Sequence, residues 1–189
     1  MTALATKATL DDLYRVEGKA ELIDGRIVEI VASGDIPGTT ASEIFVRIRE
    51  YARSSGVGRA YADGVGFALS APLDNGRESF CPDAAYVLNQ PRSMRFVDGP
   101  PDFAIEVRSE GDYGPAAEQE MADKRGDYFQ SGTKVVWDVD PIGESITCYT
   151  ANDPVGIGTT YRRGELADAE PAMPNWKIDV SKLFDDAKQ

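Results

Sequence analysis

The feature that most constrains the fold is a pair of apolar segments on either side of a helical one, between residues 103 and 139. Residues 103–107 (FAIEV) and 135–139 (VVWDV) are apolar at nearly every position, which is typical of strands buried on both faces of a sheet. Residues 115–130 repeat apolar side chains at helical spacing, and Gly132 follows where a helix is expected to end. A strand, a helix and a strand in this order predict a parallel crossover.

The rest of the chain predicts further strands and helices around this unit. Two apolar runs within residues 21–31 are separated by an Asp-Gly pair, which is a strong β-hairpin signal. Residues 41–52 repeat apolar side chains at helical spacing, with a capping box of Thr40 and Glu43 predicted at the start and Gly56 at the end. Further strands are expected at residues 58–70, 79–88 and 145–150, a strand pair at 161–166, and a short strand with a helical turn at 176–184.

Length and charge restrict the class of protein. The 189 residues fit a single domain over residues 1–189, with residues 1–9 as a flexible lead-in. Lys and Arg total 20 against 32 Asp and Glu, so the net charge is −12, and this balance repels phosphate backbones and acidic membrane surfaces. A basic protein that coats DNA is therefore not expected. No apolar run is typical of an export signal or a membrane span, and two cysteines are too few for a disulfide framework, so a cytoplasmic location is expected.

The sequence contains no histidine. This excludes Ser-His-Asp and Cys-His catalytic groups, a histidine general base and a histidine-ligated zinc site. Any catalytic chemistry must therefore come from carboxylates, Lys, Arg, Tyr, Ser, Cys or a metal ion held by oxygen ligands.

Three charged residues stand where the pattern calls for apolar ones. Asp83 interrupts one apolar strand and Glu106 interrupts another. Lys124 lies three residues after Met121 and four before Tyr128, so these side chains share one face of the predicted helix. If that face packs on the sheet, Lys124 points inward. Burying an unpaired charge is costly, so each of the three charged residues needs a partner or a bound ion.

Two interpretations of these residues remain open. Two carboxylates beside an ammonium group can hold a hard divalent cation and an anionic substrate. Alternatively, Lys124 neutralises the carboxylates in a closed ion-pair triad that leaves no room for a metal.

Other acidic and aromatic residues are expected to have ordinary roles. Tyr113, Tyr128 and Tyr161 either stack on bases or fill core and rim positions, and core or rim positions are favoured. Four acidic residues are expected on a solvated face of the helix at 115–130, namely Glu118, Glu120, Asp123 and Asp127.

Five stretches, taken in order, resemble a known family. They are ELIDGRIV at 21–28, PDAAYV at 82–87, PDFAIEVRS at 101–109, Lys124 with Tyr128, and VWDVDP at 136–141. With these stretches in register, the sequence resembles the large bacterial family of putative restriction endonucleases within the PD-(D/E)xK phosphodiesterase superfamily.

The resemblance implies an α/β fold with a restriction-endonuclease-like core, a mixed sheet flanked by helices. It implies that Asp83 and Glu106 are metal ligands and that Lys124 is the catalytic lysine, displaced from the strand onto the next helix. Glu21 falls on the glutamate of the family's first hairpin. It either completes the acidic site or is a solvated charge at the end of a strand.

The sequence departs from the family pattern at two places. Gly38-Thr39-Thr40 stand where the family commonly has a histidine, and Arg108 stands where the superfamily often has a lysine. Arg108 stays protonated at any working pH, so it cannot be a general base. It can clamp a phosphate group, or it can be a surface residue at the end of the strand.

The expected function is that of a metal-dependent phosphodiesterase, a hydrolase of the endonuclease type that acts on nucleic acid, with DNA the first candidate. Asp83, Glu106 and the Val107 carbonyl are expected to hold Mg²⁺ or Mn²⁺, and Lys124 to position or deprotonate the attacking water. The alternative is a catalytically inactive binding or assembly module on the same fold. Family analogy also implies a homodimer. A dimer can gather a basic surface from Arg47, Arg49, Arg53 and Arg59.

Overall fold

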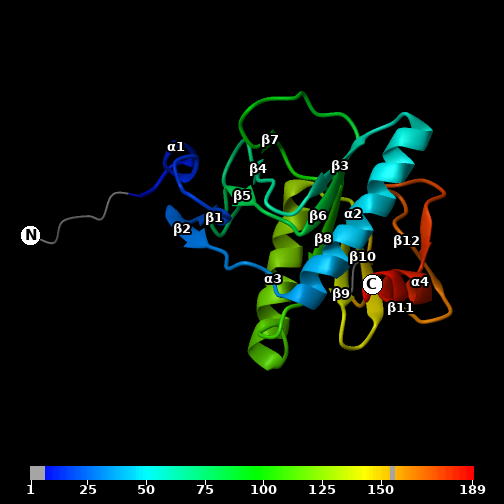
Figure 1. The fold of residues 1–189 in the computed structure, drawn as a ribbon. Helices are drawn as coiled ribbons and strands as arrows, with labels where there is room; N and C mark the ends of the chain where they lie inside the picture. Colours follow the sequence, from blue (N-terminus) through cyan, green and yellow to red (C-terminus); the bar gives the residue numbers. More distant parts are fainter. Residues whose placement is uncertain (1–6, 154–155) are drawn as a thin grey trace, which may run out of the picture.

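The computed structural model describes residues 7–153 and 156–189, and its centre is a six-stranded mixed sheet (Figure 1). In sheet order its strands are β11 (Thr159–Arg162), β10 (Ser145–Thr150), β9 (Val135–Asp140), β8 (Phe103–Val107), β6 (Ala84–Val87) and β3 (Arg59–Ala62). β8 and β9 pair in parallel, and the other neighbouring strands of this sheet pair antiparallel.

Helices and shorter strands surround this sheet. The helices are α1 (Leu10–Leu13), α2 (Asp35–Ser55), α3 (Pro115–Ser131) and α4 (Val180–Asp186). The shorter strands are β1 (Ala20–Ile23), β2 (Arg26–Glu29), β4 (Phe67–Ala68), β5 (Ser79–Phe80), β7 (Val97–Asp98), β12 (Leu166–Asp168) and β13 (Lys177–Asp179). They form the predicted β1–β2 hairpin, a β5-β4-β7 sheet and a β12–β13 pair.

The predicted parallel crossover is confirmed. α3 joins β8 to β9, and the two strands pair with Glu106 opposite Asp138. Pro115 is the first residue of α3, where the missing N–H has no helical partner to lose. Gly132 ends the helix in the left-handed region with φ 109°. The chain therefore returns to the sheet immediately after α3.

Strand alternation sends the side chains of β8 to two different cores. Phe103 and Ile105 lie on the face that α2 and α4 cover, whereas Ala104 lies on the opposite face with Tyr128 of α3. Successive side chains of a strand point to opposite faces, so Glu106 shares the face of Ala104. The sequence of β8 thus delivers one carboxylate to the side of α3.

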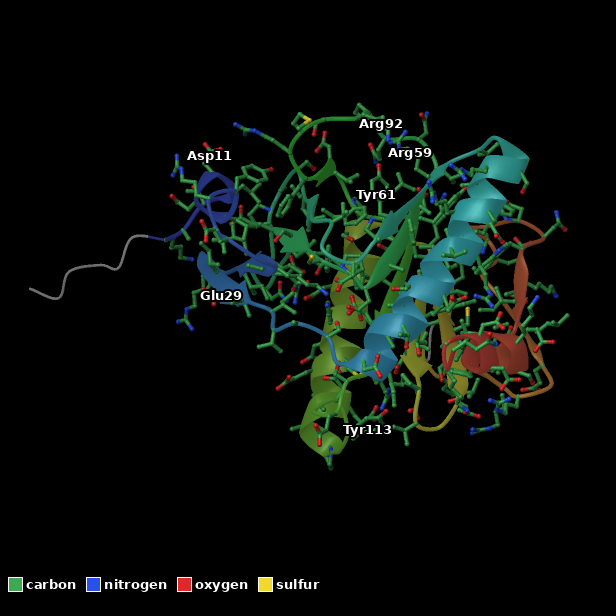
Figure 2. The ribbon with its side chains drawn as sticks, in the orientation of Figure 1. Asp11, Glu29, Arg59, Tyr61, Arg92 and Tyr113 are labelled. Atoms are coloured by element: carbon green, nitrogen blue, oxygen red, sulfur yellow. The ribbon has the colours of Figure 1, made fainter. Side chains whose placement is uncertain are left out.

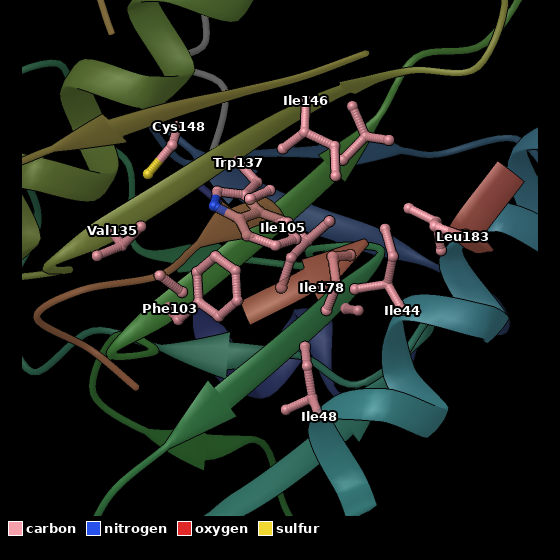
Figure 3. Close-up of a cluster of buried hydrophobic side chains, with 14 of the residues drawn as sticks. Ile44, Ile48, Phe103, Ile105, Val135, Trp137, Ile146, Cys148, Ile178 and Leu183 are labelled. Atoms are coloured by element: carbon pink, nitrogen blue, oxygen red, sulfur yellow. The ribbon is translucent and has the colours of Figure 1, made fainter. Parts of the chain in front are cut away.

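The larger core lies between the sheet and α2, and Figure 3 shows Ile44 and Ile48 of α2 beside Phe103 and Ile105 of β8. These four side chains and Trp137 are fully buried. Burying an aliphatic or aromatic side chain of this size contributes about 1.5–3 kcal/mol relative to leaving it exposed. This apolar packing holds the strands that carry the charged residues.

Helix α2 begins earlier than predicted. The capping box of Thr40 and Glu43 is wrong, because the helix starts at Asp35 and Thr40 is fully buried within it. Pro37 lies in the first turn, where a proline needs no hydrogen-bonded N–H, so the residues that indicate a turn in the sequence belong to the helix. The predicted end at Gly56 is confirmed, with φ 69°.

The strands predicted at residues 58–70 and 79–88 are each broken into two. Gly64 adopts φ 83° between β3 and β4, and Pro82, which has no N–H for a ladder, lies between β5 and β6. The predicted pairing within 161–166 is also wrong, because β11 pairs with β10 and β12 pairs with β13. As a result Asp83 lies directly before β6, at the end of a central strand.

Part of the predicted flexible lead-in at residues 1–9 lies outside the described residues. Within the described part, the amide of Ala8 donates to the carbonyl oxygen of Gly25 at 2.8 Å. Thr9 caps α1 and forms a capping box with Asp12. In the described residues, no helix is both long enough and apolar enough to span a bilayer.

Candidate active site

A cavity of about 860 Å³ lies between β8 and α3. Its walls include the segment from β2 into α2, the segment that follows β8, and one side of α3. The charged side chains that line it include Lys19, Glu21, Asp83, Glu106 and Lys124, which come from four parts of the chain. The three residues that the sequence singled out therefore reach one cavity.

Glu106 and Lys124 form an ion pair in the wall of this cavity. The Lys124 Nζ lies 2.9 Å from Oε2 of Glu106, and the hydroxyl of Tyr128 donates to Oε1 at 2.6 Å. The two charged side chains keep exposed fractions of 24% and 21%, so both reach the open space of the cavity. Helical spacing thus correctly predicted that Lys124 and Tyr128 share an inward face.

The environment of Glu106 disfavours its negative charge. Burial raises the pKa of this carboxyl to about 7, because the nearby charges of Asp83 and Glu21 oppose the favourable effect of Lys124 and of the Tyr128 hydroxyl. The pKa of Lys124 is raised instead, since Glu106 and Glu21 outweigh the cost of burying the ammonium group. In the metal-free protein Lys124 is therefore an ammonium group that donates a hydrogen bond to Glu106.

Asp83 is paired with a lysine that the sequence did not indicate. Lys19 Nζ lies 2.9 Å from Oδ1 of Asp83 and 2.6 Å from Oδ1 of Asp63. The second oxygen, Oδ2, accepts a hydrogen bond from the amide of Val107 at 2.8 Å. The N–H and C=O of one strand residue point to the same side, so the Val107 carbonyl also faces the side of Asp83.

Glu21 is not the solvated strand-end charge that was one of its two interpretations. It is 4% exposed, and its oxygens accept from the guanidinium of Arg77 and from the amide of Cys81, the latter at 2.9 Å. Lys124 Nζ lies 3.4 Å from its Oε1. Burial alone raises the pKa of this carboxyl, but the charges of Lys124 and Arg77 and the Cys81 amide bring it below its ordinary value.

Arg77 extends the polar network behind Glu21. Its Nε lies 2.7 Å from Oδ2 of Asp127, and Asn75 donates to both oxygens of that carboxylate at 2.9 Å. Asp127 is 8% exposed, so its predicted place on a solvated helix face is wrong. The physical reason is that Arg77 supplies the charge that this buried position requires.

The guanidinium group of Arg108 is paired with two carboxylates. It makes two hydrogen bonds to Asp138, at 2.8 and 2.7 Å, and further bonds to Glu118. The side chain is 13% exposed and borders the cavity. Its predicted role as a phosphate clamp stays a prediction, because the bonds to Asp138 and Glu118 already occupy the group.

The donor chemistry of the site suits a hard divalent cation, although the carboxylates are paired with protein donors. Among the described residues, no group of three or more Cys, Asp or Glu side chains is placed so that it can hold a metal ion as it stands. Asp83, Glu106 and the Val107 backbone nevertheless bring oxygen donors to one cavity, which is the ligand type that Mg²⁺ and Mn²⁺ prefer. The fit therefore depends on displacing ammonium groups from the carboxylates.

The arrangement matches neither an open cation site nor a closed ion-pair triad around Lys124, the two interpretations that the sequence left open. Lys124 bonds to Glu106 and Glu21, whereas Asp83 has Lys19 as its partner. A closed triad around Lys124 is thus not formed. The sequence patterns did not indicate Lys19, Asp63 or Arg77. One signal was available for Arg77: Glu21 is a carboxylate inside an apolar hairpin, and a buried carboxylate needs a nearby cation.

Comparison with known proteins gives a family and a fold. The family model of Uma2, described as putative restriction endonuclease, matches residues 8–181. The chain belongs to this family. The predicted family is therefore confirmed. A search of curated proteins finds no match.

A solved structure supports the fold. A putative nuclease of DUF820 from Anabaena variabilis ATCC 29413 superposes with a TM-score of 0.71 at 18% identity, covering 95% of this chain and 98% of that chain. At this identity the likeness is evidence for the fold alone. The predicted α/β fold with a mixed sheet flanked by helices is confirmed.

The arginines that a dimer was expected to gather do not border the cavity. Figure 2 shows Arg59 and Arg92 at the end of the molecule opposite Tyr113, which lies just before α3. Arg47 is paired with Glu43 and Asp186. In the structure as described, the lining of the cavity includes none of the four: Arg47, Arg49, Arg53 and Arg59.

Proposed function

We propose that this protein is a metal-dependent phosphodiesterase that hydrolyses nucleic acid. The observation that carries the proposal is the meeting of two strand-end carboxylates, Asp83 and Glu106, with Lys124 in one cavity. The family and the fold support a nuclease, and the absence of histidine excludes a histidine general base or metal ligand at this site.

Asp83, Glu106 and the Val107 carbonyl would hold Mg²⁺ or Mn²⁺. Such an ion, when bound, supplies Lewis acidity and lowers the pKa of a coordinated water. Lys124 remains an ammonium group, so it donates hydrogen bonds to the attacking water or to a phosphate oxygen and fixes its position. Tyr128 and Glu21 hold Glu106 and Lys124 in place through the contacts described above.

The charge of the chain restricts the substrate. A net charge of −12 opposes extended contact with double-stranded DNA, and the arginines of α2 lie away from the cavity. The proposed substrate is therefore a short or single-stranded nucleic acid, DNA first, because such a substrate presents fewer phosphates to the acidic surface. We include a homodimer in the proposal on family analogy alone.

The test is cleavage of single- and double-stranded DNA in Mg²⁺ or Mn²⁺ by the wild type, Asp83→Asn and Lys124→Ala. Each variant should lower the rate by about 100-fold or more, because each removes a group that acts on the reacting phosphate or water. Asp74→Asn, at an exposed loop position, serves as the matched control and should keep full activity. Circular dichroism verifies that each variant is folded. A folded Asp83→Asn variant with wild-type activity would contradict the proposal.

The second candidate is an inactive binding module. The observation that favours it is that both oxygens of Glu106 and of Asp83 already have protein partners. Under this alternative the wild type binds nucleic acid with equal affinity in Mn²⁺ and in EDTA and cleaves none of the substrates.

A further inference from the structure

Lys19 has no part in the mechanism above, and no sequence motif indicates it. It lies directly before β1, and its side chain is 15% exposed. Its ammonium group lies 2.9 Å from Asp83 and 2.6 Å from Asp63, and the side chain lines the same cavity as Lys124. The site therefore contains two lysines, each on a different carboxylate.

The position of Lys19 on Asp83 is specific to one oxygen. Oδ2 of Asp83 is held by the Val107 amide, so Oδ1 is the oxygen that turns away from the strand, and Lys19 occupies it. A divalent cation that uses Asp83 as a ligand competes with this ammonium group, because both are positive charges that need the same oxygen. In the structure, the Lys19 ammonium group therefore already occupies Asp83, one of the proposed metal ligands.

Asp63 limits how far Lys19 can move once it leaves Asp83. This carboxylate is 42% exposed and contacts the same ammonium group at 2.6 Å. Lys19 therefore keeps one partner when the other is lost. The released ammonium group then faces an open space in which the proposed substrate places phosphate groups, and lysine binds phosphate well.

We propose that Lys19 is an internal counter-ion that competes with the divalent cation for Asp83 and, once displaced, contacts the phosphate of the substrate. This inference rests on the proposed function, since it concerns the same cation site. It makes metal binding and phosphate binding cooperative, because each ligand favours the state in which Lys19 has left Asp83. Lys19 then binds the substrate phosphate. In the absence of substrate, the same side chain weakens metal binding by occupying Asp83.

The experiment is isothermal titration of Mn²⁺ into the wild type, Lys19→Met, Lys19→Gln and Lys7→Met. Lys7 is the matched control, since it forms an exposed ion pair with Asp24, with exposed fractions of 73% and 58%. Both Lys19 variants should bind Mn²⁺ about tenfold more tightly than the wild type, whereas Lys7→Met should bind as the wild type does. Lys19→Gln keeps a hydrogen-bond donor, so it provides a second neutral variant if Lys19→Met does not fold.

The outcomes separate this inference from the proposed function. Binding by the wild type without tightening in the Lys19 variants overturns the inference and leaves the cation site intact. Binding in the Lys19 variants but not in the wild type supports the inference in its strongest form. A complete absence of Mn²⁺ binding in all four proteins contradicts the proposed function and with it the inference.

A second arm tests the contact with phosphate. Dimethyl phosphate, a simple diester anion, is added before the Mn²⁺ titration. It should tighten Mn²⁺ binding to the wild type by about fivefold, the lower end of typical coupling between two sites, and should leave Lys19→Met unchanged. Equal effects of dimethyl phosphate on the two proteins overturn the proposed contact of Lys19 with phosphate.

Discussion

Glu21 and Glu106 are both within reach of Lys124, yet their pKa values shift in opposite directions. Glu21 has a lowered pKa, because Lys124, Arg77 and the Cys81 amide outweigh its burial. Glu106 has a pKa of about 7, because burial and the charge of Asp83 outweigh the effects of Lys124 and of the Tyr128 hydroxyl. The two glutamates therefore differ in the partners that their positions supply.

The opposite pKa shifts of Glu21 and Glu106 indicate which part of the polar network is structural. Glu21 belongs to a set of fixed contacts that runs through Arg77 and Asp127 to Asn75 and needs no further ion. Glu106 faces a cavity with an incompletely balanced charge, which an added cation would relieve. The same residue type thus stabilises the fold at one position and is available for chemistry at the other.

The largest expected effect comes from breaking the fixed contacts. Arg77→Met removes the cation paired with the buried Asp127 and leaves the buried Glu21 with Lys124 alone, so the free energy of unfolding should fall by about 3–5 kcal/mol. Urea denaturation measures this change. Arg95→Met is the control, because the ion pair of Arg95 with Asp11 is exposed and contributes only about 0–1 kcal/mol. Similar losses in the two variants would show that the buried network is not structural.

Tyr128→Phe tests how the tyrosine hydroxyl affects the pKa of Glu106. The tyrosine hydroxyl donates to Glu106 at 2.6 Å and favours its charged form, so its removal should raise the pKa of Glu106 further above 7. The free energy of unfolding above neutral pH should fall by about 1.5–3 kcal/mol, which is typical for a hydrogen bond to a charged group. Carbon-13 NMR of labelled glutamate measures the pKa. An unchanged pKa would mean that the hydroxyl has no part in the charge balance.

The pH dependence of stability should distinguish the two glutamates. In the metal-free protein, the folded state keeps a proton on Glu106 between pH 4.5 and about 7 that the unfolded chain releases, so this residue makes stability fall as pH rises through that range. Glu106→Gln should flatten this slope. Urea denaturation at half-unit pH intervals measures it, and an unaltered slope would contradict the raised pKa.

Glu21 should behave in the opposite way. Its folded pKa lies below the ordinary value of 4.5, so its contribution is present above pH 4.5 and is lost as pH falls below that value. Glu21→Gln should reduce the loss of stability in acid. Because the charge of Glu21 also helps to raise the pKa of Glu106, the variant should weaken, but not abolish, the fall of stability between pH 5 and 7. The same denaturation series tests this, and an effect confined to neutral pH would reverse the assignment.

The weakest effect is predicted for Glu118, which is half-exposed. Glu118 is paired with Arg108 but is 51% exposed, so Glu118→Gln should change the free energy of unfolding by only about 0–1 kcal/mol. Thermal unfolding followed by circular dichroism is sufficient to detect a larger change. A loss comparable to that of Arg77→Met would place Arg108 in the structural network.

The sequence predicted the parts of the site that depend on local periodicity. The apolar pattern predicted that Glu106 interrupts a buried strand, and helical spacing predicted that Lys124 and Tyr128 share one face of the helix. Lys19 and Arg77 could not be found in this way, because their contacts with Asp83 and Glu21 join segments that are 64 and 56 residues apart in the chain. A contact of that kind depends on how the hairpin packs on the sheet, which no local pattern records.

For the fold as well, the features with a local sequence signal were predicted and those that depend on packing were not. The crossover through α3 follows from apolar runs and a proline at the helix start, and both are local signals. The early start of α2 and the break of a predicted strand at Pro82 were missed, since a Pro or Gly is equally compatible with a turn, a helix start or a strand end until the packing is known.

The central claim is that Glu106, and not Glu21, serves the cation site. The most direct measurement is isothermal titration of Mn²⁺ into the wild type, Glu106→Gln and Glu21→Gln, each first verified as folded. We expect saturable binding to the wild type, at least about tenfold weaker binding to Glu106→Gln, and binding to Glu21→Gln within a few-fold of the wild type. An undiminished affinity in Glu106→Gln, or an absence of Mn²⁺ binding in both the wild type and Lys19→Met, would contradict this claim.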